Sequence, residues 1–95
     1  MTDFRDVTAA HRFEQGFVDE QGETRAVFAD YAVQGDTRVI LHVEADPGLR
    51  GGGAAGQFMQ ALAEHARAEG LKLAPRCSYA VVWLKRHPEY DDVVA

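Results

Sequence analysis

The first half of the chain consists of short runs in which apolar and polar residues tend to alternate, separated by turn-forming residues. Three runs predict β-strands at residues 12–18, 25–33 and 37–45. The segments between them, 19–22 and 34–36, contain glycine beside Asp or Gln and are short enough to make antiparallel hairpins. We therefore expect the N-terminal half to form an antiparallel sheet.

The second half changes to helical periodicity. Apolar residues recur at the spacing of one helical face, at Ala55, Phe58, Met59, Leu62, Ala63 and Ala66. This pattern predicts a helix that begins near Ala54 and ends at Gly70. Residues 71–74 predict a short strand, and a second helix is predicted from Tyr79 to about Arg86, with Ser78 as its cap. Residues from 91 onward are expected to form a tail.

The third strand, the first helix and the fourth strand form a βαβ unit, whose two strands should be parallel with a right-handed crossover. The predicted fold class is α+β: a mixed, mostly antiparallel sheet of about four strands with one βαβ crossover and two helices. Ligands of such sheets bind at the carboxyl ends of the strands. The segments 50–56 and 75–78 both fall at that end.

Composition narrows the classes of protein. A chain of 95 residues, 46% of them apolar, has material for one core, so we expect a single domain over residues 1–95 that is a monomer or a weak homodimer. The chain has no apolar run of membrane-spanning length, no secretory signal and only one cysteine, which favours the cytoplasm. A net charge of -5 without a Lys/Arg cluster argues against nucleic acid as a partner.

The glycine-rich segment from Arg50 to Gly56 carries the most functional information. It joins a strand to a helix, so its backbone N–H groups and the helix dipole can hold a phosphate group. A P-loop is disfavoured because Gln57-Phe58 stands where Lys-Ser/Thr is required. A dinucleotide fingerprint is disfavoured because residues 46–50 separate the strand from the glycines and no acidic residue ends the next strand.

A third interpretation is the acyl-CoA pyrophosphate loop, since Arg50-Gly51-Gly52-Gly53-Ala54-Ala55 fits the pattern Arg/Gln-x-x-Gly-x-Gly/Ala. Together with His42-Val43-Glu44, Pro75-x-Cys77-Ser78-Tyr79 and His87-Pro88-Glu89-Tyr90, this segment resembles the minimal proteins of the GCN5-related N-acetyltransferase (GNAT) family, over about residues 10–92. Gly52 departs from the pattern, because relatives often carry a bulkier residue there.

The resemblance implies binding of acetyl-CoA. The pyrophosphate would lie on the segment from Arg50 through Gly51, Gly52, Gly53, Ala54 and Ala55 to Gly56, with Ser78 nearby. The pantetheine amides would pair with the main chain of Val43 and Glu44. The closing motif at 87–90 is expected to pack the last helix onto the sheet; the alternative is that it lines the acceptor site.

Three residues are candidates for catalysis. Cys77 follows Arg76 and precedes a helix, and both neighbours favour the thiolate form; the alternative is a small buried hydrophobic residue. His42 and Glu44 should share one sheet face with Ile40, and either could act as a base. The alternative for His42 is a sheet residue that is hydrogen-bonded to a neighbour.

The expected activity is transfer of an acetyl group to an amine acceptor that the sequence does not identify. Two mechanisms stay open: direct attack by the amine with His42 or Glu44 as base, and a covalent intermediate on Cys77. The competing function is a non-catalytic module that binds CoA or acyl-CoA. No metal site is expected.

Overall fold

The structure, a computed structural model, describes residues 4–95 and contains one five-stranded sheet in the order β1-β2-β3-β4-β5. The strands are β1 (Phe4–Val7), β2 (Arg12–Val18), β3 (Thr24–Gln34), β4 (Thr37–Ala45) and β5 (Lys72–Pro75). The first four are antiparallel neighbours, and β5 is parallel to β4. The predicted α+β class with one βαβ crossover is confirmed.

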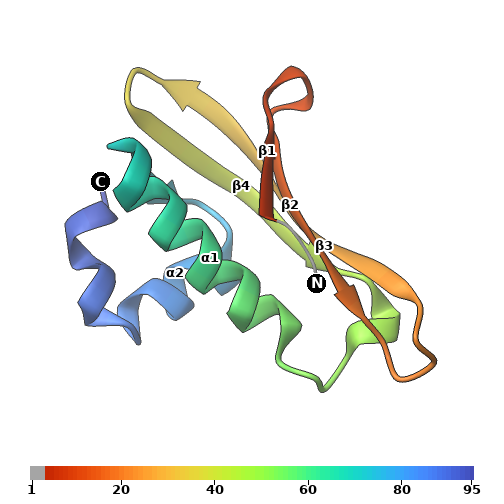
Figure 1. The fold of residues 1–95 in the computed structure, drawn as a ribbon. Helices are drawn as coiled ribbons and strands as arrows, with labels where there is room; N and C mark the ends of the chain where they lie inside the picture. The colour runs from red at the N-terminus through yellow and green to blue at the C-terminus, as the bar shows by residue number, and fades with distance from the viewer. Residues whose placement is uncertain (1–3) are drawn as a thin grey trace.

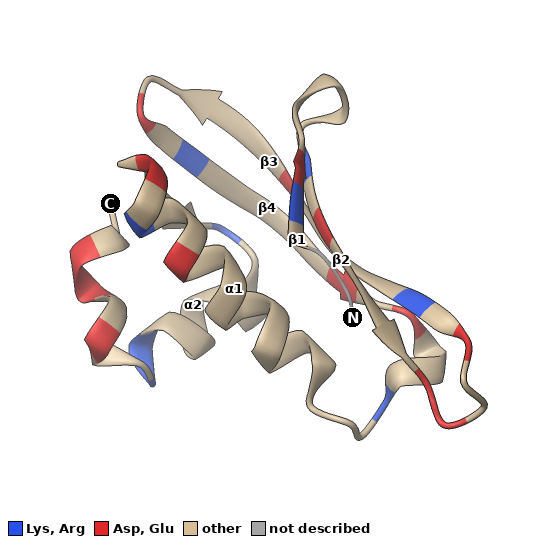
Figure 2. Cartoon of the chain, viewed as in Figure 1, with Lys and Arg blue, Asp and Glu red and all other residues tan. Residues whose placement is uncertain are grey.

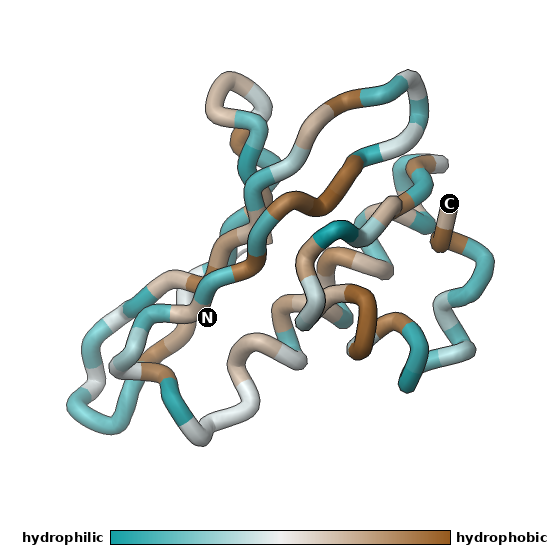
Figure 3. The backbone as a smooth tube through the Cα atoms, turned by 180° about the vertical axis from the view of Figure 1, so that it is seen from behind, coloured by the Kyte–Doolittle hydropathy of each residue, from teal (hydrophilic) through white to brown (hydrophobic). Residues whose placement is uncertain are grey.

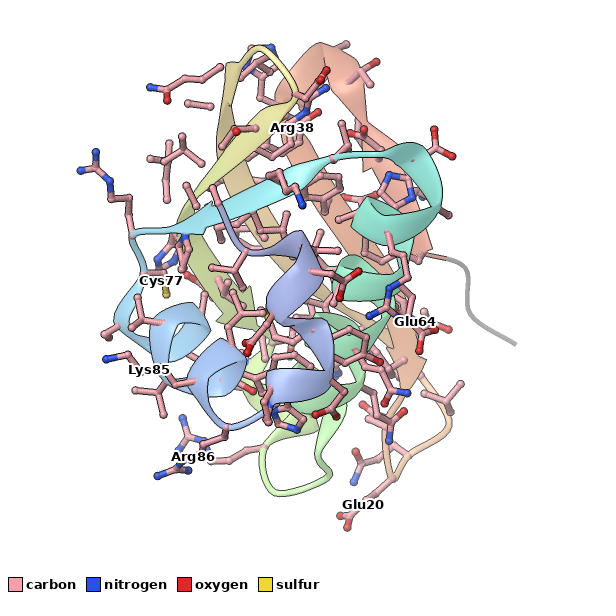
Figure 4. The ribbon with its side chains drawn as sticks, turned by 90° about the vertical axis from the view of Figure 1, so that its left-hand side faces the viewer. Glu20, Arg38, Glu64, Cys77, Lys85 and Arg86 are labelled. Carbon is pink, nitrogen blue, oxygen red and sulfur yellow. The ribbon has the colours of Figure 1, made fainter. Side chains whose placement is uncertain are left out.

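Two α-helices and three short 3₁₀ helices complete the fold. They are α1 (Ala54–Glu69), α2 (Ser78–Lys85), η1 (Thr8–Ala10), η2 (Pro47–Leu49) and η3 (Pro88–Val93). Figures 1 and 4 show α1, α2 and η3 together on one face of the sheet. Within residues 4–95, the other face of the sheet carries no α-helix.

The core lies between α1 and the helix-facing side of the sheet. Phe58, Met59 and Leu62 of α1 are fully buried, as are Phe13 of β2 and Val27 of β3. Figure 3 shows strongly hydrophobic segments in the sheet and in α2. The helix ends where the sequence predicts, because Gly70 adopts a left-handed conformation (φ 70°) that stops the chain from continuing the helix.

Strand β1 was missed by the sequence analysis, and the number of strands is therefore five. Its four residues, Phe-Arg-Asp-Val, show no period that separates them from a loop. The strand forms because it pairs with β2 and because the Phe4 ring packs on Phe13, with ring centroids 5.7 Å apart. These tertiary contacts therefore make residues 4–7 a strand, although their sequence pattern does not predict one.

A β-bulge in β4 corrects the predicted face of Ile40. Asp30 pairs with His42, but Tyr31 pairs with Ile40, so Leu41 is an extra residue in the ladder. Ile40 is consequently buried in the core, whereas His42 lies on the helix-free face. The prediction that Ile40 shares a face with His42 and Glu44 was wrong, because the bulge shifts the alternation by one residue.

Two further corrections concern the C-terminal segment. Cys77, not Ser78, occupies the N-cap position of α2, and Ser78 is the first helical residue. The predicted tail is instead η3, in which Val93 is buried, and Val94 bridges to Leu73 at the edge of β5.

Residues 87–90 have a packing role, as predicted, but the contacts below are to α1 and α2 rather than to the sheet. The His87 ring stacks on Trp83 with centroids 3.7 Å apart, and the Tyr90 hydroxyl donates a hydrogen bond to Glu64 at 2.9 Å. These contacts connect η3 to both helices and thereby fix the end of the chain against the core.

The burial of Phe58 predicts a large effect of its truncation. Phe58→Ala should lower the free energy of unfolding by about 3–5 kcal/mol, through lost burial and the cavity that remains. Urea unfolding followed by circular dichroism measures this loss. Val82→Ala is the control, because Val82 is 44% exposed and its truncation should change the free energy by less than about 0.5 kcal/mol. Equal losses in the two variants would contradict the described packing of α1.

Candidate functional site

The two parallel strands part halfway along β4. The paired positions run from Thr37 with Lys72 to Ile40 with Pro75, where β5 ends. The N–H groups of Arg76 and Cys77 both donate to the Ile40 carbonyl, at 2.8 and 3.2 Å, which turns the chain away from β4. Among the described residues, no strand pairs with residues 41–45 of β4 on this side. An extended ligand can therefore add to β4 here as a strand would.

Cys77 lies at this opening, at the junction of β5 and α2 (Figure 4). Burial opposes ionisation of its thiol, but the backbone N–H groups of Ala80, Val43 and Tyr79 outweigh burial and lower the pKa of Cys77. The thiol makes no regular cap hydrogen bond in α2, so the effect comes from several nearby amide dipoles. Arg76 is exposed and is not among the groups that lower this pKa, so the amides, rather than the expected guanidinium, stabilise the thiolate. Cys77 therefore has the electrostatic surroundings of a nucleophile.

Tyr79 is a site residue that the sequence analysis did not select. Burial and the negative charge of the Cys77 thiolate raise the pKa of the Tyr79 phenol, so the hydroxyl keeps its proton. The side chain is 39% exposed, which leaves it accessible to a ligand. The signal in the sequence was its position two residues after Cys77, in the first turn of the predicted helix.

His42 and Glu44 are brought together as the sequence predicts. His42 Nε2 lies 3.0 Å from Glu44 Oε1, and both side chains are more than half exposed on the helix-free face. The Phe28 ring is the neighbour of His42 on β3, with ring centroids 6.2 Å apart. The backbone of Val43, between the two polar residues, contacts Cys77 instead. Cys77, at the junction of β5 and α2, therefore meets the main chain of β4 at the residue between His42 and Glu44, whose side chains lie on the helix-free face.

The glycine segment forms an open main-chain loop before α1. Gly51 and Gly53 have φ angles of 83° and 75°, a conformation that side chains disfavour, and a Cβ added at either would meet open space. No side chain of the described chain caps α1, so the first N–H groups of the helix have no side-chain partner. Arg50, also exposed, adds a positive charge at the loop. These features favour an anionic ligand.

The two halves of the candidate site follow each other along the chain. The unpaired segment of β4 contains Val43 and leads, through η2, into the glycine loop. A ligand that placed an anionic group on the loop and ran back along β4 would therefore bring its far end to Cys77. Fold and site together define a mixed sheet whose two parallel strands diverge beside a glycine-rich loop.

Comparison with known proteins identifies the family. The chain belongs to the GCN5-related N-acetyltransferase family, whose model matches residues 12–93. A solution structure of a GCN5-like candidate N-acetyltransferase from Staphylococcus aureus is similar, with a TM-score of 0.67 and 26% sequence identity. The match covers 98% of this chain and 87% of that one. A comparison with curated proteins finds no match.

The charged residues are dispersed over the described part of the chain. Figure 2 shows acidic residues on the β2–β3 turn and on η3, with Lys and Arg scattered among the elements. None of the helices within residues 4–95 has the length and apolar character that crossing a bilayer requires.

The surroundings of Cys77 predict enhanced reactivity of its thiol. The rate of alkylation by iodoacetamide, measured against pH, should have a lower midpoint in the folded protein than in the urea-unfolded chain, because the nearby amides stabilise the thiolate. Cys77 is the only cysteine, so the measured rate belongs to one site. A higher midpoint in the folded protein would show that burial outweighs the amides.

Proposed function

We propose that this protein binds acetyl-CoA and transfers the acetyl group to an amine. The observation that carries the proposal is the position of Cys77. Its thiol, whose pKa is lowered, lies in the opening beside the half of β4 that has no strand partner on the β5 side. That half leads directly into an uncapped glycine loop suited to a pyrophosphate. Membership of the acetyltransferase family supports the same activity.

The main chain supplies most of the binding groups for acetyl-CoA. We assign the pyrophosphate to the loop at residues 51–56, through its backbone N–H groups other than that of Gly52, which donates to Leu49. Arg50 would be a counter-charge, and exposed Ser78 at the start of α2 a further polar group. The main chain around Val43 and Glu44 on the open side of β4 would pair with the pantetheine amides, with the Val43 carbonyl as the acceptor. This assignment places the thioester beside Cys77.

Cys77 would then act as the nucleophile. Its thiolate forms a new carbon–sulfur bond to the acetyl carbon while the bond between that carbon and the CoA sulfur breaks. The protonated Tyr79 hydroxyl would give its proton to the departing CoA sulfur. The Val43 N–H, which interacts with the thiolate in the free protein, becomes available to the carbonyl oxygen as negative charge develops on it.

The acceptor amine would attack the acetyl group on Cys77 and release its thiolate. The His42 imidazole can take the proton that the amine loses, and the Glu44 carboxylate, 3.0 Å away, orients the ring and stabilises its charged form. Both side chains are exposed, which leaves room for an amine on the helix-free face.

The assigned phosphate position predicts the effect of a carboxylate in the loop. Gly53→Glu should weaken CoA binding by at least about tenfold, a loss of about 1.4 kcal/mol, because it adds like charge beside the pyrophosphate. Calorimetric titration with CoA measures the change. Gly35→Glu is a matched control: Gly35 also has a positive φ (61°) and open surroundings, but it lies in the β3–β4 turn. Unchanged CoA binding by Gly53→Glu would refute the loop assignment, and no binding by the unaltered protein would refute the function.

The covalent route predicts an acetylated enzyme. Incubation with acetyl-CoA and no amine should add one acetyl group to the protein by mass spectrometry, and Cys77→Ala should prevent both this adduct and turnover. Transfer retained by Cys77→Ala would leave direct attack by the amine as the mechanism. The same experiment with Cys77→Ser tests whether an oxygen nucleophile, which has a much higher pKa, can replace sulfur.

A further inference from the structure

Arg25 of β3 connects the β2–β3 turn to the segment that precedes the glycine loop. Its Nε donates to Asp19 Oδ2 at 2.7 Å, and one terminal nitrogen lies 3.6 Å from Asp46 Oδ1. The Asp19 side chain is fully covered by its surroundings, and the guanidinium of Arg25 is the main cause that lowers the pKa of this carboxyl. Arg25 is thus held at one end by a buried acceptor.

The other end of this connection acts on η2. Asp46 Oδ1 accepts a hydrogen bond from the Gly48 N–H at 2.8 Å, and the Asp46 carbonyl accepts one from Leu49 at 2.9 Å. The Leu49 carbonyl in turn accepts the Gly52 N–H at 3.2 Å. A continuous series of polar contacts therefore runs from Arg25 to the middle of the glycine loop.

The packing around Arg25 leaves little freedom for η2. A Cβ at Gly48 would lie 2.7 Å from both Cδ and Nε of Arg25, so the arginine stem is in close contact with the backbone. Asp46 is also fixed to β3, because its N–H donates to the Ala26 carbonyl at 3.0 Å. The loop itself has little other support on its outer side, where a cavity of about 490 Å³ separates it from the β2–β3 turn.

We propose that Arg25 is a positioning residue for the phosphate-binding loop: it holds Asp46 and η2 so that the N–H groups of the glycine loop face one anion. This inference rests on the proposed binding of CoA at the same loop. Arg25 does not contact the ligand in this proposal, and it acts through Asp46 and Gly48. Figures 1 and 4 place the β2–β3 turn, where Glu20 is labelled, at the same end of the molecule as the glycine loop.

The test compares binding of CoA with binding of pantetheine, which lacks the phosphate groups. Arg25→Gln should weaken CoA binding in calorimetry by about tenfold, because the loop N–H groups would no longer be aligned on the phosphate. The affinity for pantetheine should stay unchanged. Arg25→Lys should restore part of the CoA affinity, because one ammonium keeps the charge but cannot span both carboxylates as a guanidinium does. Arg67→Gln is the control, since it removes a comparable ion pair to Asp92 (2.7 Å) at the opposite end of α1.

A measurement without ligand separates this proposal from the proposed function. In amide NMR spectra of the free protein, Arg25→Gln should shift the resonances of residues 48–53, and Arg67→Gln should not. Unmoved loop resonances, unchanged CoA affinity, or equal losses for CoA and pantetheine would each overturn the positioning role. If the unaltered protein does not bind CoA, the proposed function fails, and the loop resonances alone decide whether Arg25 positions the loop.

Discussion

The candidate site depends on the difference in length between two neighbouring parallel strands, β4 and β5. Strand β4 has nine residues and β5 has four, so the parallel pair ends at Ile40 while β4 continues to Ala45. An unpaired backbone edge inside a folded protein is costly unless it is exposed or occupied. Here the edge opens onto Cys77, and the peptide groups that would pair with a longer β5 are left for a ligand.

The position of Cys77 follows from this opening. The double hydrogen bond to the Ile40 carbonyl turns the chain into α2, and the turn places the cysteine at the N-terminus of the helix and beside the Val43 N–H. Helix and strand amides then act on the same sulfur atom. The environment that lowers its pKa therefore comes from main chain alone, and it does not depend on the identity of a neighbouring cationic side chain.

The parts of the fold with strong local signals could be predicted from the sequence. The face of α1, its end at Gly70 and the βαβ crossover all follow from periodicity, glycine conformation and the handedness rule. The proximity of His42 and Glu44 also followed, since residues two apart in a strand share a face.

The remaining features depend on contacts that no local pattern records. The apolar run Val39-Ile40-Leu41 shows no alternation, so the bulge at Leu41 has no signature, and its position is decided by pairing with β3. Strand β1 depends on the Phe4 ring packing on Phe13. The raised pKa of Tyr79 depends chiefly on the burial of its side chain, which is a property of the tertiary fold.

The bulge at Leu41 shifts the alternation of side chains in β4, so that residues before and after it follow opposite patterns of inward and outward positions. Before it, Ile40 faces the helices; after it, His42 faces the open side, although the two residues are only two positions apart. Gain or loss of a single residue at this point would exchange the environments of every later position in the strand, moving His42 and Glu44 into the core and Val43 out of it. Length changes among descendants of this protein should therefore accumulate in the β2–β3 and β3–β4 turns, while the number of residues in β4 stays constant.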